Sequence, residues 1–110
     1  MTFDDYQKKA LKTAVNYSDP LMAKTIWAMG VAGEAGEVIE KWKKIIAYKD
    51  GQVSRADLDE LGKELADVVW YIAVLADNLG LSFDQIMRDN IKKLADRQKR
   101  NVIKGSGNYR

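Results

Sequence analysis

Two short stretches, Glu34-Ala35-Gly36-Glu37 and Glu64-Leu65-Ala66-Asp67, each carry two carboxylates three residues apart. On a helix, residues i and i+3 share a face, so each stretch presents its acids side by side. The stretches lie at equal distances from the Asp50–Gly51 bond, inside the turn-forming segment Lys49-Asp50-Gly51-Gln52. If two helices leave this turn antiparallel, Glu37 lies level with Glu64 and Glu34 with Asp67. The pattern therefore predicts a helical hairpin on which four carboxylates converge.

Four convergent carboxylates repel one another and are costly to remove from water unless a cation neutralises them. The usual candidate is Mg²⁺, a hard cation that prefers oxygen ligands, with Mn²⁺ as a substitute. Such a site is typical of phosphoryl or nucleotidyl chemistry, in which the metal holds phosphate oxygens and a spare carboxylate orients or deprotonates a water. The structural alternatives are a solvated acidic face, or a salt bridge from Lys41 or Lys63 to Asp67. The apolar neighbours of Asp67 predict that its side chain is buried.

The chain has 110 residues, which indicates one domain over 1–110, and it contains no Cys and no His. Without His, we exclude histidine acid–base catalysis, Ser-His triads and His-ligated zinc, and we disfavour a di-iron bundle, whose usual motif is Glu-x-x-His. The net charge of +2 indicates no polymeric nucleic-acid partner. No signal peptide or membrane-spanning segment is visible, so we expect a cytoplasmic protein without membrane contact.

The apolar pattern predicts an all-α fold of four helices. They are expected from Thr2 to Val15, from Pro20 to Tyr48, from Ser54 to Leu79, and from Ser82 to the basic run that starts at Arg97. A basic tail over residues 100–110 is expected to be mobile unless a ligand or a partner subunit orders it.

The two central helices carry coiled-coil-like spacing. The predicted seams are Val31, Ala35, Val38, Trp42 and Ile45 on one helix, and Leu61, Leu65, Val68, Ile72, Leu75 and Leu79 on the other. Each acid directly precedes a seam position, so we expect the acids to flank the interface in one register.

Residues outside the acidic stretches are candidates for substrate binding. Tyr71 lies one turn beyond Asp67, where an aromatic ring can stack on a base, although packing in the core is the structural alternative. Side chains that can bind a triphosphate are Lys41, Asn90, Lys93 and Arg97, although a single such residue is more often solvated.

The segment Gly33–Glu40, followed by Glu64–Tyr71, resembles the MazG-like all-α nucleoside triphosphate pyrophosphohydrolases, whose motif is Glu-x-x-Glu, a spacer and Glu-x-x-Asp. The stretch Asn90–Arg97 is similar to the fourth helix of that family. The resemblance covers most of the chain and implies an oligomeric MazG-like four-helix bundle. It implies Mg²⁺-dependent hydrolysis of a (deoxy)nucleoside triphosphate between the α and β phosphates, which gives a monophosphate and pyrophosphate.

By this resemblance, the metal ligands and catalytic residues are Glu34, Glu37, Glu64 and Asp67, and Tyr71, Asn90, Lys93 and Arg97 match substrate-binding positions. Members of the family form homodimers or dimer-based homotetramers. Longer members carry a Glu where this chain has Gly33, which favours the compact single-domain branch. Three alternatives stay open: a related pyrophosphatase acting on dUTP, dCTP or phosphoribosyl-ATP, a nucleotide-binding protein without turnover, and a non-enzymatic helical interaction protein.

Overall fold

The computed structural model describes residues 1–110 and contains four α-helices and no strands, as predicted. They are α1 (Phe3–Leu11), α2 (Pro20–Tyr48), α3 (Arg55–Asn78) and α4 (Phe83–Lys99). Side-chain oxygens of Thr2, Ser54 and Ser82 cap α1, α3 and α4, as the sequence indicates. The first helix ends at Leu11 rather than Val15, because Thr13 Oγ1 donates to Ala10 O at 2.8 Å and so competes with helical bonding.

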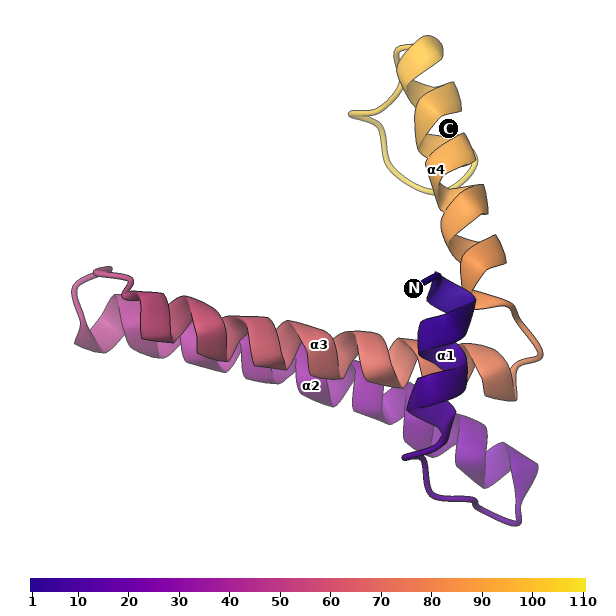
Figure 1. Ribbon diagram of the computed structural model, residues 1–110. Coiled ribbons are helices and arrows are strands. Elements are labelled where there is room, and N and C mark those ends of the chain that lie inside the picture. The colour runs from indigo at the N-terminus through magenta and orange to yellow at the C-terminus, as the bar shows by residue number, and fades with distance from the viewer.

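The long helices α2 and α3 form the antiparallel hairpin that the mirrored acids predict (Figure 1). Asp50 and Gly51 close the turn with left-handed φ values of 51° and 74°, a conformation that suits glycine. The register is also confirmed, since Gly30 contacts Tyr71 and Lys41 contacts Glu60, and the members of each pair lie equally far from this turn.

The face of α2 that packs on α3 matches the predicted seam only in part: Ile45 is buried and Val31 and Val38 are half-buried, as predicted. Ala23, Trp27 and Ile45 are buried, but Ala35 and Trp42 are exposed, Trp42 by 44%. On α3 the seam residues Leu65 and Leu79 are likewise more than half exposed. Both helices are apolar on more than one side, and the hairpin closes on the side where Gly30 lets the helices approach. The packed face therefore includes Glu34, while a second apolar face stays open.

Helix α1 crosses the end of α3 and holds the corner from which α4 departs (Figure 1). The buried Gln7 donates through Nε2 to Ala73 O at 3.0 Å and to Leu81 O at 3.2 Å, and Oε1 accepts from Phe83 N at 3.4 Å. Phe83 joins a small core with Ala10, Ala23, Trp27, Ala73 and Val74. Helix α1 therefore ties the α3–α4 corner to the hairpin.

Helix α4 projects away from the hairpin at a bend of 106° and makes no contact with α2 (Figure 1). The radius of gyration is 17.0 Å, against about 13 Å for a compact domain of this length. The accessible surface is 8153 Å², against about 6100 Å² for a compact monomer of this mass. The bundle is therefore open within one chain. No single helix is both long and apolar enough to cross a membrane, and α3 and α4 meet that criterion only as a bent pair.

Candidate functional site

Three of the four predicted acids meet between the two long helices. Carboxylate oxygens of Glu34 on α2 and of Glu64 and Asp67 on α3 all lie within 4.8 Å of one another. The antiparallel register produces this arrangement, since Glu34 and Asp67 lie equally far from the turn. Glu37 does not belong to this group and is exposed to solvent.

Asp67 is exposed, so the expectation that it is buried was wrong. Consecutive residues of a helix point about 100° apart, so the apolar neighbours of Asp67 in the sequence cover other sides of α3. Its carboxylate lies at the edge of the hairpin interface, whereas Glu34 and Glu64 are half-buried. The group therefore has a solvated side from which a ligand can approach.

The acids of this group repel one another electrostatically. Removal from water raises the pKa of Glu34, and the charges of Asp67, Glu64 and Glu37 raise it further. The contribution of Glu37 indicates that it lies near the group even though it is not a member. A cation bound among these oxygens would relieve both effects.

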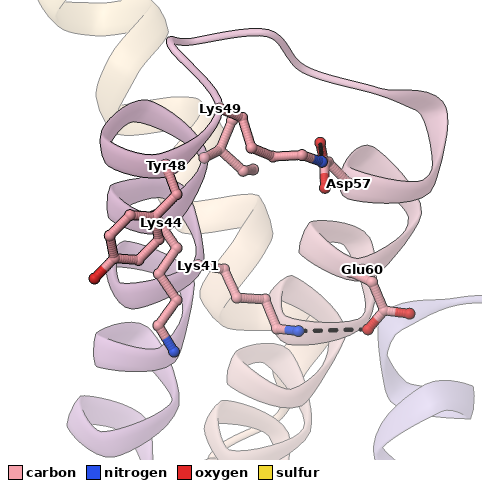
Figure 2. A pocket seen from close by; sticks show the side chains of 7 residues that line it. Lys41, Lys44, Tyr48, Lys49, Asp57 and Glu60 are labelled. Carbon is pink, nitrogen blue, oxygen red and sulfur yellow. Dashed lines mark hydrogen bonds and ion pairs between the residues drawn. The ribbon is translucent and has the colours of Figure 1, made fainter.

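Lys41 provides the nearest positive charge to the acidic group. Its Nζ lies 3.4 Å from Glu60 Oε2 (Figure 2). It also lies 3.5 Å from Glu64 Oε1. Burial lowers the pKa of Lys41, but the bonds and charges of Glu60 and Glu64 outweigh that effect and raise it overall. Lys63 pairs with Glu60, so neither lysine makes the salt bridge to Asp67 that the structural alternative requires.

A cavity of about 260 Å³ lies beside Lys41, at the turn end of the hairpin (Figure 2). It is lined by Lys41, Lys44, Ile45, Tyr48, Lys49, Asp57 and Glu60. Within this lining, Lys49 Nζ pairs with Asp57 Oδ2 at 2.7 Å. The cavity adjoins the acidic group through Lys41, and its lining is predominantly charged.

Tyr71 lies in an aromatic cluster one turn from Asp67. Its ring centroid is 6.0 Å from that of Trp27 and 5.0 Å from that of Trp70. The ring rests on the backbone of Gly30, where even a Cβ would collide with it. Tyr71 is half-buried, and its contact with a nucleoside stays a prediction.

The predicted residues of α4 are not brought to the acidic group within one chain. Asn90, Lys93 and Arg97 lie on a helix that points away from the hairpin. The side chains of Lys93 and Arg97 instead contact the tail, Asn108 in both cases. A second copy of the chain is needed if these residues and the acids share one substrate.

Tyr6 lies near Asp67, a placement that the sequence did not indicate. Burial raises the pKa of its hydroxyl, and the negative charge of Asp67 raises it further. In the sequence Tyr6 is only one member of the apolar stripe of the first helix. Its position beside Asp67 results from the way α1 crosses α3.

The model of the MazG nucleotide pyrophosphohydrolase domain matches residues 24–102, which span both acidic stretches and α4. The chain is also 40% identical over 114 residues to the gene 37 protein of Mycobacterium phage L5, with both chains covered along their whole length. No solved structure matches the chain. The acids, their spacing and the helical hairpin agree with the domain match, so the chain belongs to the MazG nucleotide pyrophosphohydrolase family.

Proposed function

We propose that this protein is a Mg²⁺-dependent nucleoside triphosphate pyrophosphohydrolase, which converts a (deoxy)nucleoside triphosphate to the monophosphate and pyrophosphate. The observation that carries the proposal is the convergence of Glu34, Glu64 and Asp67 across an antiparallel hairpin, in a chain of the MazG family. A cytoplasmic location, where nucleoside triphosphates are abundant, is part of the same proposal.

The donor set suits a hard divalent cation. All three groups offer carboxylate oxygens, no sulfur or imidazole is present, and the oxygens lie within 4.8 Å of one another. Glu34, Glu64 and Asp67 would together hold the cation from one side and leave its other side open to water and phosphate oxygens. Mn²⁺ has similar preferences and is the expected substitute. When bound, the cation would neutralise phosphate oxygens and lower the pKa of a water molecule.

We assign the remaining residues separate roles according to their positions. Glu37, solvated and beside the ligand group, is placed to orient the attacking water or accept its proton. Lys41 approaches both the acids and the cavity, where its ammonium can hold a phosphate oxygen. Tyr71 and Tyr6 lie on the hairpin and α1 sides of Asp67, where they can limit how the nucleoside approaches.

The protein is proposed to work as a homodimer or a dimer-based homotetramer in which α4 of one subunit completes the site of another. Asn90, Lys93 and Arg97 would then hold the β and γ phosphates in trans. The open apolar face of the hairpin supports this assembly, since it carries Ile39, Trp42, Ile46, Leu58, Leu65 and Val69, all exposed. The surplus accessible surface of roughly 2000 Å² also exceeds the 800 Å² per partner of an ordinary interface.

The test is release of pyrophosphate from a panel of canonical and modified nucleoside triphosphates, with Mg²⁺ and with EDTA. We expect Mg²⁺-dependent release with a nucleoside monophosphate as the other product. The variants Glu64→Gln and Asp67→Asn should lose activity by at least about 100-fold. Glu40→Gln, which removes an acid outside the group, should keep it. Release of orthophosphate and a diphosphate would contradict the proposed cleavage site. A folded protein without turnover would contradict the proposal that the protein is an enzyme.

A further inference from the structure

The tail after α4 folds back on the last turns of that helix. Arg110 holds the tail together, since its guanidinium donates to the carbonyl oxygens of Val102 and Ile103 at 3.1 Å each, and to that of Gly107. A side chain at Gly105 would collide with Arg110, so this glycine permits the fold. Arg100 Nη2 donates to Arg110 O at 2.7 Å and fastens the end of the tail to α4.

Beneath this tail lies Arg97, whose residue is only 4% exposed. Its Nη2 donates to Gly107 O at 3.1 Å and to Asn108 Oδ1 at 3.4 Å, while its Nε is buried without any hydrogen-bond partner. Lys93 Nζ donates to the same Asn108 Oδ1 at 3.0 Å. One neutral amide oxygen therefore bridges two cationic side chains of α4.

Negative charge compensates this concentration of positive charge only in part. The segment from Arg97 to Arg110 contains five basic residues and no acidic one. The neighbouring Asp96 is engaged by Arg100 at 2.8 Å. Burial lowers the pKa of Arg97, and the charges of Arg110 and Arg100 lower it further, while the weaker effect of the Asp96 charge opposes them. A buried guanidinium that has only neutral acceptors, and whose buried Nε–H has none, is a site for an anionic oxygen.

We infer that the tail is an internal strap, in which Asn108 Oδ1 and Gly107 O stand in for phosphate oxygens on Lys93 and Arg97. The inference rests on the proposed function, because it takes the phosphates of the substrate, or the pyrophosphate product, as the natural occupants. An anionic phosphate oxygen adds charge–charge attraction to the hydrogen bonds that the two cations already make to neutral oxygens, so a phosphate displaces the strap. Between turnovers the strap supplies two hydrogen-bond acceptors to the buried Arg97. A phosphate that binds takes the place of these acceptors, so phosphate binding and tail release occur together.

The test is calorimetric titration of the full chain with inorganic pyrophosphate in EDTA, so that no metal links the ligand to the acids of α2 and α3. Asn108→Asp places a carboxylate on Lys93 and Arg97 and should weaken pyrophosphate binding by about tenfold. Asn108→Ala removes the competing oxygen and should bind at least as tightly as the wild type. Tyr109→Ala is the matched control, since this neighbouring residue is fully exposed.

Hydrogen exchange of residues 101–110 gives a readout that does not depend on turnover. Pyrophosphate should speed exchange of Val102 N–H and Gly105 N–H, which are bonded to Arg97 O at 2.9 Å and to Val102 O at 3.2 Å when the strap is closed. Slower or unchanged exchange, weaker binding by Asn108→Ala, or no pyrophosphate binding would each overturn the strap. Turnover with Mg²⁺ but without tail release would contradict the strap and leave the proposed function intact. Tail release without turnover would contradict the proposed function and leave the strap intact.

Discussion

The ring of Tyr71 on α3 lies directly on the backbone of Gly30 on α2, with no room for a Cβ between them. This contact lies one helical turn from both Glu34 and Asp67, so it sets the separation of the helices where the acids meet. The aromatic packing and the candidate metal site are therefore parts of one interface.

Gly30→Ala should destabilise the protein by about 1–3 kcal/mol, since overpacking at the Tyr71 ring exceeds the gain in helix propensity. Gly33→Ala is the matched control. A Cβ at Gly33 meets nothing within 4 Å, so this change should stabilise the helix by about 0.5–1 kcal/mol. Urea unfolding of both variants measures the difference, and equal effects would argue against close packing at Gly30.

Glu34→Gln should raise the thermal midpoint of the Mg²⁺-free protein by a few degrees. The pKa of Glu34 is raised in the folded state, so its ionised form destabilises the fold at neutral pH. In the wild type without metal, stability should recover as the pH falls through that raised pKa. The substitution should also abolish stabilisation by Mg²⁺, measured by differential scanning calorimetry. Glu40→Gln should leave the Mg²⁺ effect unchanged, and a loss of the effect there would mean that the cation binds elsewhere.

Lys41→Met should lower the thermal midpoint of the Mg²⁺-free protein, because Glu64 then faces Glu34 and Asp67 without a compensating cation. Added Mg²⁺ should restore most of the loss. Lys43→Met is the control, since its lysine pairs only with the solvated Glu40. If both variants behave alike with and without Mg²⁺, Lys41 does not balance the acidic group.

Asp57→Asn should make the stability of the hairpin less dependent on pH in the acidic range. The bond from Lys49 Nζ, followed by the backbone bond at Ser54, lowers the pKa of Asp57 from 3.8 to about 2. Because the pKa of Asp57 is lower in the folded state, its carboxylate stabilises the fold at pH values above the ordinary pKa of 3.8. That stabilisation is lost as the pH falls toward 2. The variant should thus unfold at a lower temperature than the wild type near neutral pH, and the gap should narrow in acid. Asp59→Asn, with a more exposed ion pair, should show a smaller gap.

Gln7→Leu should destabilise the protein by about 1–3 kcal/mol, because the carbonyl oxygens of Ala73 and Leu81 lose a buried donor. Hydrogen exchange at Phe83 N–H should speed up, since Gln7 Oε1 accepts from it. Gln98→Leu, on the exposed side of α4, should change neither quantity. An unchanged exchange rate at Phe83 in Gln7→Leu would show that other contacts hold the α3–α4 corner.

The sequence by itself determined which four segments form helices, the caps at Thr2, Ser54 and Ser82, and the hairpin register. These features depend on bonds and side-chain positions within a few residues, such as the Ser54 cap and the left-handed turn at Asp50 and Gly51. The regular helical repeat then carries the register outward, so the meeting of Glu34 with Asp67 could be predicted from the turn alone.

Only the tertiary structure decided which faces pack and which side chains share a site. The two long helices are apolar on more than one side, so spacing alone could not choose the face on which Gly30 accommodates Tyr71. That choice buried Glu34 partly, left Asp67 exposed and kept Glu37 outside the group of three carboxylates. The placement of Tyr6 beside Asp67, and of Arg97 far from it under the tail, follows from how α1 and α4 pack, which no local pattern encodes.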